Sequence, residues 1–103
     1  MEKEKFRTWL CKRMGKKPAG DCLSRCGTVE RSLKIDLDNE FKQDEGKSLI
    51  DKLSYTIKDE QNKVEAPQEF HFDNPKTIRT RMANMKNASK RYFEFCKETN
   101  EVQ

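Results

Sequence analysis

Apolar residues recur at helical spacing along most of the chain, and this pattern predicts an all-α fold. A first helix is expected from about Lys3 to Met14, because its apolar residues fall on one stripe and its basic residues fall off it. A second helix is expected from about Pro18 to Lys34, after a GKKPAG segment whose first glycine suits a helix end and whose proline suits a first turn. Gly27 inside that helix suggests a close contact with another helix. The predicted buried face of this second helix consists of Ala19, Cys22, Leu23, Cys26, Val29 and Leu33.

The middle of the chain predicts a shorter third helix and then a long loop. KIDLDNEF reads as a turn or short helix, and the third helix should start near Asp44 or Ser48 and run to about Lys58. Residues 59–73 show no helical period and predict either a mobile loop or a β-ribbon-like arm. Expected core residues of the turn and the third helix are Ile35, Leu37, Phe41, Leu49, Ile50, Leu53 and Ile57, and those expected to pin the loop by alternation are Val64, Phe70 and Phe72.

The last predicted helix follows the loop and continues to about Glu98. Asp73 or Asn74 can cap it, and Pro75 suits its first turn. Its apolar line consists of Ile78, Met82, Met85, Ser89, Tyr92 and Cys96. Together the elements predict a single domain over residues 1–103, a compact bundle of four main helices with frayed ends at 1–3 and 99–103, standing alone or as the N-terminal domain of a longer protein.

Charge adds a candidate function to this fold. The 103 residues are 39% charged and carry a net charge of +4. Residues 1–34 hold ten Lys or Arg and four Asp or Glu; residues 35–73 hold five and eleven; residues 74–103 hold seven and three. Two basic ends therefore flank an acidic middle, a distribution that suits nucleic-acid binding but also arises in charge-rich helical proteins without any such role.

Two basic clusters refine that idea. On the last helix, four cations share one flank of the apolar line, whereas Arg81 and Arg91 lie on the other flank. The four are Arg79, Lys86, Lys90 and Lys97. A second cluster lies at the junction of the first two helices, where backbone N–H groups at a helix start favour an anion. The residues predicted to contact DNA phosphates are Lys16, Lys17, Arg25, Arg79, Lys86 and Lys90.

Other chemistry finds little support in the pattern. The cysteines of the second and last helices lie on core lines, which indicates buried free thiols rather than a metal site. The single histidine, His71, has no nucleophile at a recognisable spacing. No enzyme activity, cofactor, metal or small-molecule substrate is therefore expected. The longest apolar runs and the MEKEKF start predict neither a membrane span nor a secretion signal, so a cytoplasmic protein is expected.

Three segments resemble the SAM-like core-binding domain of phage integrases and related tyrosine recombinases. They are FRTWL (6–10), AGDCLSRCGTVERSLKIDLD (19–38) and NMKNASKRYFEFC (84–96), the last matching a family helix that reads basic residue, Tyr, apolar, Glu, Phe. The resemblance implies a helical module that grips one face of a DNA duplex while a separate domain cleaves the strand. Restriction and other mobile-element proteins use a similar module. No Arg, His and Tyr catalytic set is present, so the resemblance implies DNA contact without recombinase activity.

Two functions remain open at this stage. The first is a non-catalytic module that binds double-stranded DNA through the basic helix faces. The second is a small protein-interaction or inhibitor module that uses the acidic middle segment. Its residues would be Asp36, Asp38, Glu40, Asp44 and Glu45. A steep salt dependence of duplex binding favours the first function over the second.

Overall fold

The computed structural model describes residues 1–70, 72 and 75–102, and within these ranges the chain is helical and contains no strand. The all-α prediction is confirmed. None of the helices in these ranges is long and apolar enough to cross a membrane. The elements in chain order are α1 (Lys3–Cys11), α2 (Lys16–Leu33), α3 (Leu37–Asp44), α4 (Lys47–Leu53), α5 (Ile57–Gln61), the 3-10 turn η1 (Pro75–Thr77) and α6 (Ile78–Val102).

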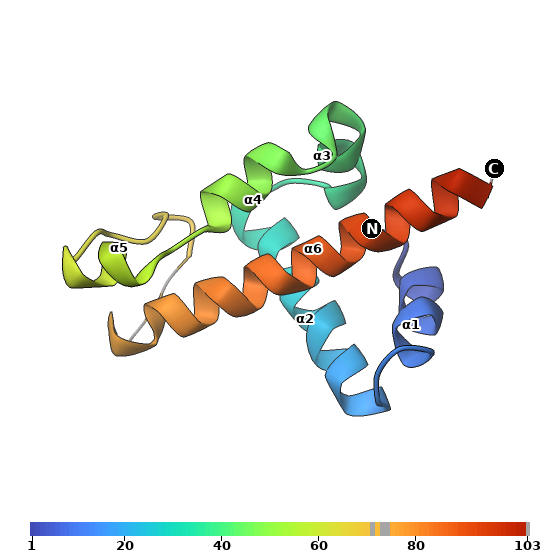
Figure 1. Cartoon of the computed structure of the whole chain (residues 1–103), viewed down its shortest axis with the longest axis horizontal. Helices are drawn as coiled ribbons and strands as arrows, with labels where there is room; N and C mark the ends of the chain where they lie inside the picture. Colours follow the sequence, from blue (N-terminus) through green and yellow to red (C-terminus); the bar gives the residue numbers. More distant parts are fainter. Residues whose placement is uncertain (71, 73–74, 103) are drawn as a thin grey trace.

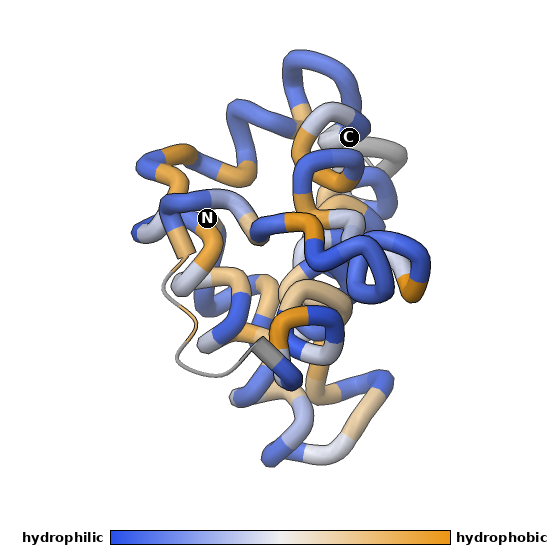
Figure 2. The backbone as a smooth tube through the Cα atoms, turned by 90° about the vertical axis from the view of Figure 1, so that its left-hand side faces the viewer, coloured by the Kyte–Doolittle hydropathy of each residue, from blue (hydrophilic) through white to orange (hydrophobic). Residues whose placement is uncertain are grey.

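Four helices, α1 to α4, pack on the long helix α6 (Figure 1). Helix α2 crosses it and makes the most extensive contact with it, and α1 packs against α2 near the C-terminal part of α6. Helices α3 and α4 lie along the opposite side of α6. In Figure 2 apolar positions alternate with polar ones along the tube. A helix with such a pattern has only a narrow apolar stripe, which it buries by packing on a neighbour.

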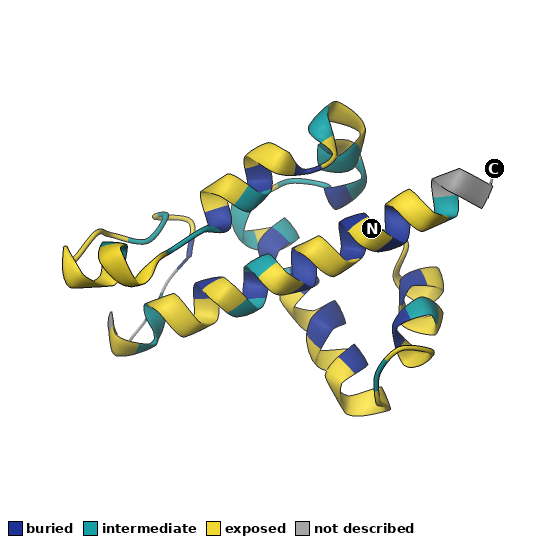
Figure 3. Cartoon of the chain, viewed as in Figure 1, coloured by how far each residue is buried: buried dark blue, intermediate teal, exposed yellow. Residues whose placement is uncertain are grey.

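The core follows the predicted stripes closely. In Figure 3 the buried positions of α2 and α6 recur once per turn and alternate with exposed positions. The predicted face of α2 is buried except at Leu33, which is half-buried, and the predicted line of α6 is buried except at the half-buried Ile78. Fully buried side chains come from most of the helices: Phe6, Leu10, Cys26, Val29, Leu37, Leu53, Met82, Ser89 and Tyr92.

The predicted third helix is wrong as a single element. Glu45 and Gly46 both adopt left-handed backbone angles (φ 60° and 80°), which end α3 and start α4. Helix α4 then stops at Leu53, and Thr56 opens α5 with a capping box to Asp59. Because α5 begins a new register, Ile57 is 58% exposed instead of buried. The division into four main helices therefore does not describe this part of the chain.

The segment after α5 is anchored by its aromatic residues. Phe70 is buried and stacks on Phe72 with ring centroids 5.9 Å apart, as the loop prediction required. Val64 is 45% exposed, so the prediction that its side chain pins the loop is wrong. The suggested caps Asp73 and Asn74 lie outside the described residues.

Smaller differences concern the ends of helices. Helix α1 ends at Cys11 because the next residues form a turn on the Leu10 carbonyl, and α6 continues to Val102. Gly27 does not mark a close helix contact, since a Cβ atom there would meet the guanidinium of Arg31 in the same helix. The N-terminus is docked rather than frayed, because the Met1 ammonium forms ion pairs.

Candidate nucleic-acid interface

Three neighbouring hollows lie along α6 and share lining residues. Arg25 and Asn84 line both the first and the middle hollow, and Asn87 and Arg91 line both the middle and the last. The three hollows therefore adjoin one another, the first two between α2 and α6 and the last between α3 and α6, and we name the set the α2–α6 groove. Its cationic lining residues are Lys17 and Arg25 from α2 and Arg81, Lys90, Arg91 and Lys97 from α6.

The middle hollow has the densest set of available cations. It has a volume of about 400 Å³ and is lined by Lys17 and Arg25 from α2 and by Arg91 from α6. All three side chains are exposed, and no carboxylate in the described part of the chain lies within ion-pair distance of any of them. Asp21 is the acidic residue of this lining. A surface of this kind suits an anion that accepts several charge-assisted hydrogen bonds.

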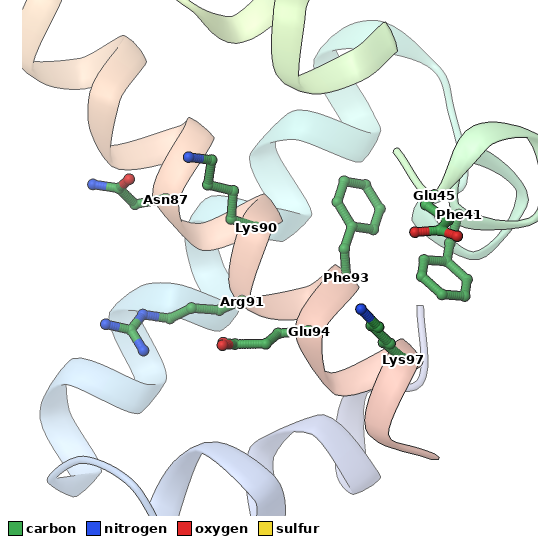
Figure 4. Close-up of a pocket in the computed structure, with 8 residues that line it drawn as sticks. All are labelled: Phe41, Glu45, Asn87, Lys90, Arg91, Phe93, Glu94 and Lys97. Carbon is green, nitrogen blue, oxygen red and sulfur yellow. The ribbon is translucent and has the colours of Figure 1, made fainter. Parts of the chain in front are cut away.

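The last hollow adjoins α3 and has a volume of about 530 Å³. Figure 4 shows Asn87, Lys90 and Arg91 extending from one side of α6, whereas Phe93 extends towards the side where α3 carries Phe41. Its cations are offset by two carboxylates of the lining, those of Glu45 and Glu94. This end of the groove is therefore weaker as an anion site than the middle.

The start of α2 adds backbone donors to the groove. Its cap residue Gly15 has no side chain to bond the first N–H groups, and no acidic residue occupies the first turn. The first two residues of the helix are Lys16 and Lys17, both exposed. The helix start therefore carries partial positive charge beside the lysine charges, which again favours an anion.

The structure separates the six residues predicted to bind DNA. Lys17 and Arg25 line the same hollow, Lys90 lines the adjoining one, and Lys16 is exposed at the start of α2. Lys86 is half-buried and lines none of the three hollows. Arg79 is engaged, because its guanidinium pairs with Glu60 of α5. The predicted flank of α6 is thus not one continuous free edge.

Sequence reasoning left out the cation at the centre of the groove, Arg91. Helical spacing placed it on the flank opposite the predicted edge, and α2 packs on that flank. Its place follows from the packing of α2 on α6, which the sequence pattern does not show. Cys22 and Cys26 face Ala88, which lies one turn before Arg91, and their thiols donate to the Ala88 carbonyl at 3.9 and 3.3 Å.

The acidic segment is largely engaged within the fold. The Met1 ammonium lies 3.1 Å from Asp36 Oδ1, 3.3 Å from Asp38 Oδ2 and 3.4 Å from Glu30 Oε2. Burial alone would lower the pKa of this amine, but the three carboxylates outweigh burial and raise the pKa to about 10. Asp44 accepts hydrogen bonds from the backbone N–H groups of Gly46 and Ser48. These interactions leave fewer carboxylates of the segment available to a protein partner.

The cysteines behave as core residues. All four are free; Cys11 is exposed, and the other three are buried as the apolar stripes predicted. A hydrogen bond between Cys26 and Cys22, together with burial, raises the pKa of the Cys26 thiol well above its ordinary value. Burial raises the pKa of the Cys96 thiol to about 11. Among the residues that the structure describes, no three His, Cys, Asp or Glu side chains are grouped to hold a metal ion. His71 lies outside those residues.

Comparison with known proteins gives no family. No family model matches the chain, and neither the curated proteins nor the solved structures include a significant match. The resemblance to SAM-like core-binding domains is neither supported nor contradicted by these comparisons.

Proposed function

We propose that this chain is a non-catalytic DNA-binding module that grips duplex phosphates through the α2–α6 groove. The observation that carries the proposal is the convergence of Lys17, Arg25 and Arg91 from two helices on one hollow, where no carboxylate of the described residues pairs with any of them. Exposed cations on one helix usually form a solvated face. Three cations that two crossing helices bring to the same hollow are better suited to a polyanion.

The residue types favour phosphate over a carboxylate partner. The arginine guanidinium presents a planar fork of donors that matches two phosphate oxygens, and lysine supplies a point charge. Asn84 and Asn87 add neutral donors between the cations along the same stretch of α6. Contacts of this kind give affinity and orientation rather than sequence recognition.

The family resemblance agrees with this placement. The two longest segments that resemble a core-binding domain, 19–38 and 84–96, include most of α2 and the middle of α6. These are the two helices that line the groove. The proposal therefore extends to a SAM-like DNA-gripping module of the kind that mobile-element proteins carry, with strand chemistry left to another domain.

The test compares two triple variants that remove the same number of charges. The groove variant is K17Q/R25Q/R91Q and the edge variant is R79Q/K86Q/K90Q, so each loses three positive charges. Binding to a fluorescein-labelled duplex is measured by anisotropy between 50 and 300 mM KCl. Each lost phosphate contact should reduce the log–log salt slope by about 0.9, so the groove variant should lose about 2.7 and the edge variant about 0.9, from Lys90 alone.

Folding is not expected to limit this comparison, because the groove side chains are exposed and unpaired in the described part of the chain. Circular dichroism of each variant checks that point. If both variants lose the same amount of the log–log salt slope, binding depends on net charge alone and not on the groove. A groove variant with the slope of the wild type would show that the groove is not the DNA interface.

A further inference from the structure

The first hollow of the α2–α6 groove is lined by a pair of stacked aromatic rings, and an arginine of the same lining lies over one of them. It has a volume of about 500 Å³, within the range of small-molecule sites, and lies near the start of α6. Its lining includes Phe70 and Phe72, two arginines and several small polar side chains. Phosphate binding alone gives no reason for the aromatic pair.

Phe72 forms an anchored platform in this hollow. Its ring lies nearly parallel to that of Phe70, with centroids 5.9 Å apart and an interplanar angle of 24°. Phe70 is only 7% exposed and is held in the core, whereas Phe72 is half-buried and lines the hollow. A fixed and partly exposed ring is the usual platform for an unpaired base, since every base has a π-face.

Arg81 lies over the same ring, at a distance that falls about 1 Å short of what an inserted base requires. Its guanidinium carbon is 6.0 Å from the Phe72 ring centroid. By comparison, Arg13 stacks directly on Trp9 at 3.8 Å. A base between two planar groups needs about 6.8 Å, or twice the stacking distance of about 3.4 Å. Arg81 is exposed and has no ion pair in the described part of the chain, so it can move by the remaining ångström.

The surrounding polar groups suit a nucleotide. Arg25 lines both this hollow and the middle one, so a backbone phosphate held there continues the phosphate path of the groove. Asn84 and Ser32 can bond the edge of a base, and an asparagine amide matches adenine in particular. The carboxylate in this lining, Glu69, is neutralised by Lys52 at 3.2 Å and repels an anion less for that reason.

We propose that this hollow binds an unpaired nucleobase of the DNA, stacked between Phe72 and Arg81 with its phosphate on Arg25. The inference rests on the proposed function, because the groove must hold the adjoining duplex. It makes the preferred ligand a duplex with a single-stranded overhang or junction rather than a blunt duplex. The base is recognised mainly through its flat face, so the overhang sequence should matter little.

The test uses two duplexes with the same paired region, one blunt and one with a four-nucleotide overhang containing 2-aminopurine. The wild type should bind the overhang duplex about ten-fold more tightly, in line with the usual contribution of one stacked base. The 2-aminopurine fluorescence should fall on binding, because stacking quenches it. Phe72→Leu should remove both effects, Phe72→Tyr should keep them, and Arg81→Gln should reduce them.

The matched control is Phe41→Leu. Phe41 is also half-buried and also stacks on a buried ring, that of Phe93, but it lines the last hollow. This control should keep the ten-fold preference. If the Phe72→Leu variant does not fold, the Arg81→Gln variant is used for the test instead, because a substitution at the exposed Arg81 should not disturb the fold.

The outcomes separate this inference from the proposed function. Salt-dependent binding of the blunt duplex with no preference for the overhang would overturn the inference and leave the proposed function standing. A preference that survives both Phe72→Leu and Arg81→Gln would also overturn it. Absence of salt-dependent binding to either duplex would refute the proposed function, and this inference with it.

Discussion

Gly46→Ala should destabilise the fold strongly, because two separate features of the structure exclude a side chain at this position. Gly46 has φ of +80°, in the left-handed region that L-residues with a Cβ atom avoid. A Cβ atom built there would lie 2.2 Å from Cε2 of Phe93 and 2.5 Å from two other atoms of the ring. The turn between α3 and α4 thus packs its backbone directly on α6.

The magnitude follows from these two terms. The left-handed conformation costs about 1–2 kcal/mol for a residue with a Cβ atom. The overlap forces Phe93 to move by more than 1 Å from carbon contacts that normally lie at about 3.5–4.0 Å, and overpacking of this kind costs about 1–3 kcal/mol. Phe93 is 6% exposed and is packed against Phe41 and Tyr92, so it has little room to yield. The expected loss is about 3 kcal/mol.

Urea unfolding followed by circular dichroism measures this loss. Gly20→Ala is the matched control, because Gly20 lies exposed within α2 and a Cβ atom there meets nothing within 4 Å. It should stabilise the protein by about 0.5–1 kcal/mol. In a Phe93→Leu background the Gly46→Ala cost should fall by about 1–2 kcal/mol, since the ring that clashes is gone.

Two results would refute this reasoning. A loss below about 0.5 kcal/mol in Gly46→Ala would mean that the turn does not pack on α6 as described. A full loss that persists unchanged with Phe93→Leu would mean that backbone strain alone, and not contact with α6, accounts for the effect.

Three further predictions concern buried and titrating groups. Ser89→Ala should be neutral or stabilising in urea unfolding, because the Ser89 hydroxyl is fully buried with no hydrogen-bond partner in the described structure; a loss above about 1 kcal/mol would reveal a partner. The Met1 amine, whose pKa is raised from 8.0 to about 10, should contribute stability that is complete below pH 8 and lost as pH rises through 10. A shift of two pKa units corresponds to about 2.7 kcal/mol of stability, which solvent screening should reduce to about 1 kcal/mol. A free energy of unfolding that does not change between pH 8 and 10.5 would contradict the ion pairs. At pH 8 a thiol reagent should label Cys11 quickly and Cys26 only on unfolding, and rapid labelling of all four cysteines would contradict the buried assignments.

Most of the helices could be predicted from the sequence, whereas the division of the predicted third helix into α4 and α5 could not. In α2 and α6 the stripe extends over several turns, so the period identifies both the helix and its buried face. The break at Gly46 lies close to the predicted start of the third helix, near Asp44 or Ser48. The break before Thr56 does not show in the pattern, because a stripe that includes Leu53 and Ile57 looks continuous across it. Local capping by Thr56 and Asp59 decided that boundary.

The candidate site was only half predictable for a different reason. Helical spacing shows which cations share a flank, but it does not show which flank faces another helix. Arg91 became the centre of the groove because α2 crosses α6 on its side. Arg79 is not available to a phosphate, because it forms an ion pair with Glu60 of α5, a helix that the sequence did not predict. Both outcomes depend on packing between segments far apart in the chain.

The most direct test of the groove as the DNA interface is an NMR titration of the ¹⁵N-labelled chain with a short duplex at low salt. The largest amide shifts should fall in two segments, 16–25 in α2 and 84–97 in α6, and they should diminish together as salt is added. Arg91 should be among the most affected residues, and Arg79 should not. Shifts centred on the acidic segment 36–45, or no shifts at a duplex concentration that saturates other DNA-binding modules, would contradict the groove as the DNA interface.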